Sequence, residues 1–226
     1  MKWKRQHIAI FIALLVHTSG LIGILFTPYR NWFIRYTPLN LVLMAFLLAW
    51  NQRSRVRAFY IFFAIAALAG FLAEWIGINT SLLFGSYRYG DMLGPAFGGV
   101  PLLIGLNWFL VVFCSGSIMH QVQDCMRSKP NGASAMPPRL AAWSVVLDGA
   151  LLAVLFDWIM EPAAMQLGFW EWKGGTVPFY NYVCWLLIST GLLVVFRLFS
   201  FRGSNHFAVH LFIIELFFFL VLRIYL

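Results

Sequence analysis

Long apolar runs alternate with short polar segments along the chain of 226 residues. A helix that crosses the roughly 30 Å hydrocarbon core of a membrane needs about 20 apolar residues. Seven runs reach or approach that length, the second being the shortest: Ile8–Phe26, Pro38–Trp50, Ala58–Ile78, Val100–His120, Leu140–Met160, Tyr180–Phe199 and Phe207–Tyr225. The pattern predicts an all-α protein, a polytopic membrane helix bundle of about seven transmembrane helices, with residues 1–226 forming a single transmembrane domain.

Composition and charge agree with lipid as the main surroundings. Hydrophobic residues make up 62% of the chain and charged residues only 11%, too few for the shell of a soluble domain. The net charge of +8 comes from basic residues gathered between the apolar runs, so it indicates topology and contacts with lipid headgroups rather than nucleic acid. Eleven of the 16 Lys and Arg residues fall on one side, which predicts the N-terminus inside and the C-terminus outside.

Two loops on the predicted outer side are long and aromatic. Asn79–Gly99 is rich in Gly and Tyr, and Glu161–Pro178 holds Trp170 and Trp172. The Ser128–Pro138 loop has the composition of an ordinary inner linker. The first apolar run follows basic residues as a signal peptide does, but without a small-residue cleavage site after it, so we expect a retained helix.

Three carboxylates lie where a membrane makes charge costly. Glu74 stands about one turn before the outer end of the third run, and Asp157 and Glu161 stand at the outer end of the fifth. Their i, i+4 spacing places Asp157 and Glu161 on one helical face, and we expect Pro162 to end that helix. Ionisable groups at membrane depth cost several kcal/mol on insertion scales and therefore indicate function by default.

Other polar and aromatic residues share that membrane level. Asn107 and Trp108 fall in the outer half of the fourth run, and Asn181 and Trp185 in that of the sixth. No spacing of His, Cys or carboxylate residues resembles a metal-binding motif, so no metal is predicted. Simpler interpretations remain open: helix-end carboxylates snorkel to the interface, and single Trp residues form interfacial belts. Glu215 suits pairing with Arg or His on a neighbouring helix as well as a role in a site, and His17 and His210 suit hydrogen bonds between helices better than metal binding.

Paired carboxyl groups in an apolar site have a chemical use. Desolvation and a neighbouring like charge favour the neutral form of one acid, which can then act as a general acid. The ionised partner can hold or deprotonate a water molecule. Aromatic faces stabilise a transient carbocation. This set of groups suits the addition of water to an unactivated C=C bond of a lipid.

Several separated motifs occur in order along the chain: Glu74–Gly90, Gly99-Val100-Pro101, Asn107-Trp108, Asp157-x-x-x-Glu161-Pro162-x-Ala164, Gly168-x-Trp170-x-Trp172 and Val177-Pro178-x-Tyr180-Asn181. In this order they resemble the membrane carotenoid-biosynthesis hydratases, which include γ-carotene 1′,2′-hydratases and bisanhydrobacterioruberin hydratase. The resemblance covers about half of the chain, residues 73–185. One departure is Ser81, where a Gly is expected after Thr80.

The resemblance implies a carotenoid 1,2-hydratase, a hydro-lyase that adds water across the terminal C1=C2 bond of an acyclic ψ-end. Asp157 or Glu74 would deliver the proton, and Glu161 would position water with Asn107 or Asn181. Trp108 and Trp170 or Trp172 would flank the cation, and Tyr87 and Tyr89 would gate the mouth or bind the end group. No cofactor is implied, because hydration is redox-neutral.

The same resemblance implies a carotenoid substrate drawn from the bilayer, surrounding membrane lipids, and a multi-pass location in a bacterial inner (cytoplasmic) membrane. It leaves association with other carotenoid enzymes open. Two rival functions remain. A carotenoid end-group cyclase begins with a similar protonation but excludes water, and a proton-coupled transporter would also use intramembrane carboxylates.

Overall fold

The computed structural model describes residues 4–127, 137–199, 201 and 205–226. Within these residues the chain folds into eight α-helices. Their bounds are α1 Arg5–Phe26, α2 Arg30–Arg35, α3 Thr37–Asn51, α4 Val56–Thr80, α5 Ile104–Arg127, α6 Pro138–Gln166, α7 Phe179–Leu198 and α8 His206–Tyr225. The fold is therefore an all-α polytopic membrane bundle, as predicted. Most of the predicted Ser128–Pro138 linker lies outside the described residues.

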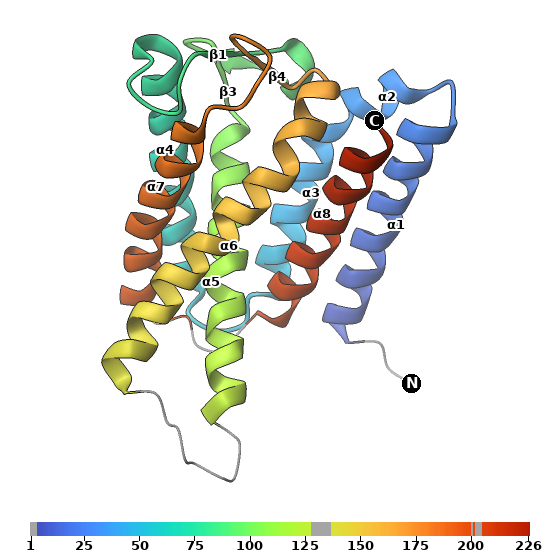
Figure 1. Cartoon of the computed structure of the whole chain (residues 1–226). Coiled ribbons are helices and arrows are strands. Elements are labelled where there is room, and N and C mark those ends of the chain that lie inside the picture. Colours follow the sequence, from blue (N-terminus) through green and yellow to red (C-terminus); the bar gives the residue numbers. More distant parts are fainter. Residues whose placement is uncertain (1–3, 128–136, 200, 202–204) are drawn as a thin grey trace.

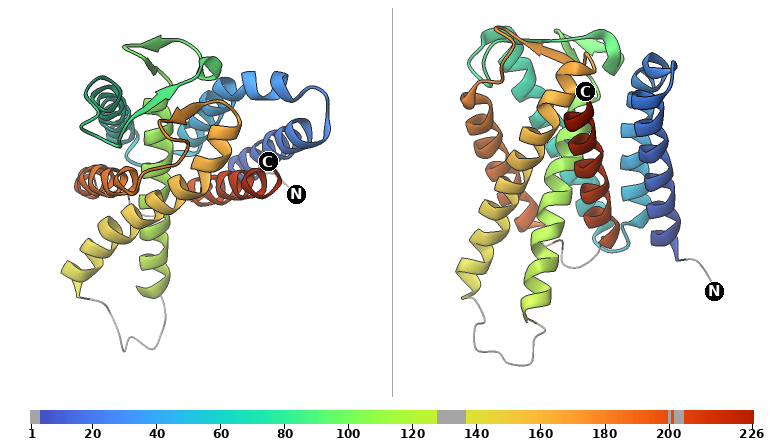
Figure 2. Two further views of the ribbon diagram at one scale, coloured as in Figure 1. Left: turned by 45° about the horizontal axis from the view of Figure 1, so that its top comes forward. Right: turned by 45° about the vertical axis from the view of Figure 1, so that its right-hand side comes forward.

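The helices run roughly side by side, and α5 passes through the middle (Figure 1). It packs against α3, α4, α6, α7 and α8. The start of α1 and the end of α8 lie at opposite ends of the bundle (Figures 1 and 2). Close approach of α4 and α5 depends on Gly105, where a Cβ atom would lie 2.3 Å from the carbonyl oxygen of Ala67.

Five of the described helices, α1, α4, α6, α7 and α8, are long and apolar enough to cross a membrane. The other two predicted spans differ for separate reasons. Helix α3 has 15 residues, which agrees with the shortest predicted run. Helix α5 is long but more polar, and residues 108–117 are all buried. Neighbouring helices shield α5 from lipid. Fewer of its side chains therefore have to be apolar than in a helix at the periphery of the bundle.

The loops at one end of the bundle form two small antiparallel sheets. Strand β1 (Tyr87–Tyr89) pairs with β4 (Trp170–Trp172), and β2 (Ala96–Phe97) pairs with β3 (Val100–Pro101). We call this end of the bundle the strand end (Figure 1). The sequence prediction that the fourth helix begins at Val100 is therefore wrong. Gly98 and Gly99 have positive φ values and turn the chain into a hairpin, which delays the helix to Ile104.

Helix α6 does not end at Pro162 as the sequence predicted. It continues to Gln166 with Pro162 inside. Proline lacks the N–H that would bond the carbonyl four residues earlier, here that of Trp158. Arg223 of α8 supplies the missing donor, because its Nη1 lies 2.8 Å from the Trp158 oxygen and its guanidinium lies over the Trp158 ring. A neighbouring helix thus satisfies the carbonyl that proline leaves free.

Ser81 follows the last residue of α4 and has a left-handed backbone, with φ of +55°. Glycine adopts this conformation at the end of a helix without a Cβ penalty. We expect Ser81→Gly to stabilise the fold by about 0.5–1 kcal/mol, measured as a higher thermal midpoint in detergent. The substitution also removes the Oγ that accepts a bond from Ser86, so Ser86→Ala is the control for that bond alone. An unchanged or lower midpoint for Ser81→Gly would contradict the expectation.

Candidate active site

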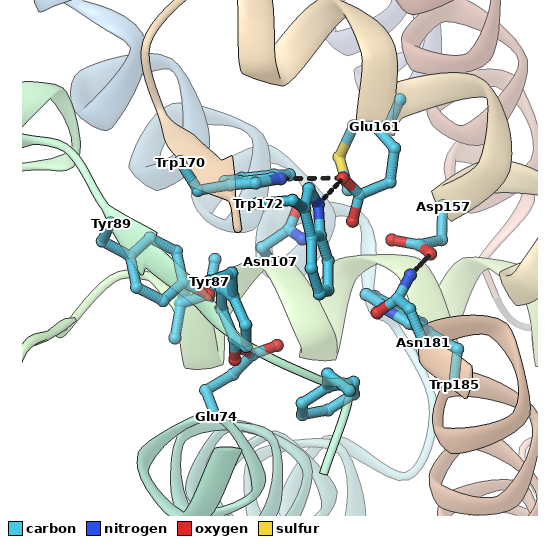
Figure 3. Close-up of a pocket in the computed structure, with 13 residues that line it drawn as sticks. Glu74, Tyr87, Tyr89, Asn107, Asp157, Glu161, Trp170, Trp172, Asn181 and Trp185 are labelled. Carbon is cyan, nitrogen blue, oxygen red and sulfur yellow. Dashed lines mark hydrogen bonds between the residues drawn. The ribbon is translucent and has the colours of Figure 1, made fainter. Parts of the chain in front are cut away.

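A small cavity lies at the strand end between α4, α5, α6 and α7, covered by β1 and β4 (Figure 3). Its volume is about 20 Å³, enough for about one water molecule. The side chains around it are Glu74, Phe84, Tyr87, Tyr89, Ile104, Asn107, Asp157, Met160, Glu161, Trp170, Trp172, Asn181 and Trp185. Nine of the ten residues predicted from the sequence therefore meet at one cavity, and Trp108 is the exception.

Glu74 is buried and accepts hydrogen bonds on both carboxylate oxygens. The Tyr87 hydroxyl donates to Oε2, the Tyr89 hydroxyl donates to the same oxygen at 2.9 Å, and the Trp108 indole N–H donates to Oε1 at 2.9 Å. Burial, together with the neighbouring Glu74 charge, raises the pKa of Tyr87 and of Tyr89 above the usual range, so both stay protonated. An ionised carboxylate can accept all three bonds. The two tyrosines predicted at the mouth of the site therefore act as donors to Glu74.

Glu161 is held by the second aromatic loop. The indole N–H groups of Trp170 and Trp172 both donate to its Oε2, each at 2.8 Å. Strand pairing aligns the two loops, with Tyr87 opposite Trp172 and Tyr89 opposite Trp170. One small sheet thus delivers hydroxyl donors to Glu74 on α4 and indole donors to Glu161 on α6.

Asp157 differs from the other two carboxyl groups in having few partners. Its Oδ2 accepts a bond of 2.7 Å from the Asn181 amide. Its Oδ1 is buried and has no hydrogen-bond partner among the described residues. Asp157 and Glu161 stand one helical turn apart on α6, and their carboxyl groups face the same space in Figure 3. A buried carboxyl oxygen without a partner is costly unless it is protonated or meets a ligand.

Trp108 lies behind the cavity instead of lining it. Its ring stacks on Trp185, with centroids 3.7 Å apart and planes at 11°. It fits against α4 because residue 70 is glycine, where a Cβ atom would lie 2.3 Å from the Trp108 side chain. Trp185, which lines the cavity, stands one helical turn after Asn181. The sequence placed Trp185 at the level of the carboxylates but gave it no role, and its spacing from Asn181 is the signal that could have assigned one.

Phe84, Ile104 and Met160 also line the cavity, and we did not predict them. Ile104 stands one turn before Asn107 and Trp108, and Met160 is next to Glu161, so helical neighbours could have indicated both. Phe84 lies in a loop between α4 and β1, where no periodic pattern predicts which side chain turns inward.

The remaining intramembrane polar groups lie away from the cavity. His17 bonds through Nδ1 to the Ala13 oxygen and lies 3.4 Å through Nε2 from Asn40 on α3, the interhelical contact that was expected. His210 forms a hydrogen bond within α8, between its Nδ1 and the backbone oxygen of His206. Glu215 is buried in α8 and does not line the cavity. No group of three His, Cys, Asp or Glu residues that could hold a metal occurs in the described part of the chain.

The fold and this cavity define a multi-pass membrane protein with a buried acidic site. The family model described as carotenoid biosynthesis protein matches residues 34–225, and the chain belongs to that family. The match extends beyond residues 73–185 to include α3 and α8. Searches of curated proteins and of solved structures find no match.

Proposed function

We propose that the protein is a carotenoid hydratase that adds water across the terminal C1=C2 bond of an acyclic carotenoid ψ-end. The observation that carries the proposal is the asymmetry of the three buried carboxyl groups around a water-sized cavity. Glu74 accepts three hydrogen bonds and Glu161 accepts two, whereas Asp157 keeps a buried oxygen without a partner among the described residues. An acid-catalysed hydration needs one neutral acid, one base and one water in contact.

Asp157 is the proton donor in this proposal. A neutral carboxyl group carries one O–H donor, so the oxygen that lacks a partner can carry the proton toward the substrate. Asn181 fixes the other oxygen and so orients the acid. The proton bonds to C-2 through the π electrons of the C1=C2 bond, and the positive charge develops at the tertiary carbon C-1.

Glu161 is the base in the second step. Water, positioned by Glu161 with Asn107 or Asn181, forms a C–O bond to C-1 and gives a proton to the Glu161 carboxylate. That proton returns to Asp157, one turn away on the same helix, which restores the neutral acid and the ionised base for the next cycle. The rings of Trp172 and Trp185 line the cavity and would stabilise the cation through their π faces.

Glu74 is an anchor and not the acid in this mechanism. Its three donors come from β1 and α5, so its charge ties the strand end to the bundle. Arg88 and Glu171 form an ion pair across the same strands. Their side chains are 79% and 60% exposed, so the pair contributes little to stability. The ordering of the aromatic loops therefore depends on buried carboxylates.

The substrate would come from the bilayer, because a carotenoid is apolar and the cavity lies among membrane helices. The resemblance favours the cytoplasmic membrane of a bacterium, and the distribution of basic residues favours an orientation with the strand end outward. Other enzymes of carotenoid synthesis are the partners that such a substrate would favour.

Expression in cells that accumulate lycopene or γ-carotene tests the proposal. We expect hydroxylated carotenoids one water molecule heavier, with the oxygen derived from solvent and detected by ¹⁸O labelling and mass spectrometry. The control is an Asp157→Asn variant present in the membrane at the same level. Unchanged pigment from a correctly inserted wild type would overturn the proposal. Cyclised products of unchanged mass would instead assign an end-group cyclase.

A further inference from the structure

The cavity is too small for the proposed reaction as it stands. It has room for about one water molecule, whereas hydration requires a branched end group of several carbon atoms beside that water. Packed interiors do not yield such space without a rearrangement. Part of the cavity wall must therefore move when substrate binds.

Most of the wall is tied in place. Hydrogen bonds to buried carboxylates hold Tyr87, Tyr89, Trp170, Trp172 and Asn181. The remaining lining residues apart from Phe84 stand on long helices. Phe84 alone combines an apolar side chain with a position outside helices and strands among the described lining residues. It is the one described lining side chain that neither a helix nor a side-chain hydrogen bond holds in place.

The backbone at Phe84 is strained. Its φ is +63°, a left-handed conformation that is a genuine outlier for a bulky aromatic residue. The side chain is nevertheless 1% exposed, and it fits because Gly77 of α4 leaves room, where a Cβ atom would lie 2.9 Å from the Phe84 ring. Strain of this kind is retained where the surroundings demand one conformation, often at ligand sites.

Residues 81–85 and the neighbouring start of α7 carry exposed apolar side chains. Leu82 is 68% exposed and Phe179, at the start of α7, is 80% exposed. Two polar contacts tie the segment to α7: the Tyr180 hydroxyl donates to the Leu82 oxygen at 3.0 Å, and the Phe84 N–H donates to the Cys184 sulfur at 3.2 Å. An outward movement of residues 81–85 would therefore open the cavity toward the bilayer between α4 and α7.

We propose that the Phe84 ring fills the space in which the isoprenoid end group binds. The ring is displaced when that end group enters between α4 and α7. Phe84 is thus a specificity-determining residue for a branched apolar alkene end. This inference rests on the proposed hydratase function and deepens it. It also replaces the earlier expectation that Tyr87 and Tyr89 gate the mouth.

Steady-state kinetics with lycopene in proteoliposomes tests the proposal after wild-type hydration has been established. Phe84→Ala removes the ring that must be displaced, so we expect KM to fall about five-fold with kcat retained. Phe84→Trp puts a larger ring into the binding space of the end group, so we expect kcat/KM to fall by about ten-fold or more. If Phe84→Ala inserts poorly into the membrane, Phe84→Leu serves instead, and we expect it to lower KM by a smaller factor.

Phe62→Ala is the matched control, because Phe62 is a fully buried ring of α4 that does not line the cavity. It should lower the thermal midpoint and leave KM unchanged. A purely structural Phe84 would behave like Phe62, with an unchanged KM in Phe84→Ala and a normal kcat/KM in the folded fraction of Phe84→Trp. That result would overturn the inference and leave the hydratase function standing. A wild type without hydration would overturn the function itself.

Discussion

Asp157→Asn is expected to lower turnover roughly 100- to 10,000-fold while the protein still inserts and folds, since general acid catalysis contributes a factor of that size. Asparagine has nearly the shape of the neutral acid and can keep one contact with Asn181, but it has no proton of suitable acidity to give to C-2. The measurement is the initial rate of hydroxylated product per folded protein in proteoliposomes. A mainly reduced kcat would agree with loss of a group that acts in the transition state.

Asp148→Asn is the matched control for that variant. Asp148 is on the same helix, bonds to Ser144 and lies outside the cavity, so its substitution should leave the rate within about two-fold. Near-normal turnover by Asp157→Asn would mean that the proton comes from another group. Equal losses in both variants would indicate a general effect on α6 instead of lost acid catalysis.

Glu74→Leu is expected to destabilise the protein by roughly 3 kcal/mol or more, because it leaves two hydroxyl groups and one indole N–H buried without an acceptor. The measurement is the thermal or denaturant midpoint in detergent, together with protease cleavage of the loop between α4 and α5. Increased cleavage is expected there, since β1 loses its tie to α4.

Glu74→Gln separates the anchoring role from a catalytic one. Glutamine keeps an acceptor oxygen and the volume of the side chain, so we expect a smaller loss of stability and substantial remaining turnover. Turnover by Glu74→Gln as low as that of Asp157→Asn, with normal stability, would instead make Glu74 the proton donor. The two carboxamide variants together therefore decide between the acids that the sequence left open.

Hydropathy predicted the helices well, because the demand for apolar side chains in lipid acts on each helix separately. The two errors in helix bounds have different causes, one in a distant segment and one in the adjacent turn. At Pro162, the carbonyl left free by proline finds Arg223 on α8, a partner 65 residues away. At Val100, two glycines with positive φ form a hairpin before the helix can start.

The candidate site was predictable as a set of residues but not as an arrangement. Glu74, Asp157 and Glu161 stand out because charge is expensive at that depth, and helix topology brings them to one level. Their roles depend on which donors reach each oxygen. Trp108 was expected beside the substrate, yet its ring lies behind Trp185 and its N–H holds Glu74. Phe84 lies within the motif Glu74–Gly90, but the motif did not indicate that its side chain turns inward, since loop conformation sets its direction.

The sequence by itself determined that this chain is a bundle of membrane helices with costly carboxylates near one end. Hydrophobic burial and the cost of charge in lipid depend on residue type and spacing, so both can be inferred from the sequence alone. Only the tertiary structure decided that β1 pairs with β4, that Glu74 and Glu161 accept several hydrogen bonds each, and that Asp157 keeps a buried oxygen without a partner among the described residues. Hydrogen bonds are short and directional, and they join segments of this chain up to 157 residues apart among the described residues. Their pattern therefore exists only once the chain has folded.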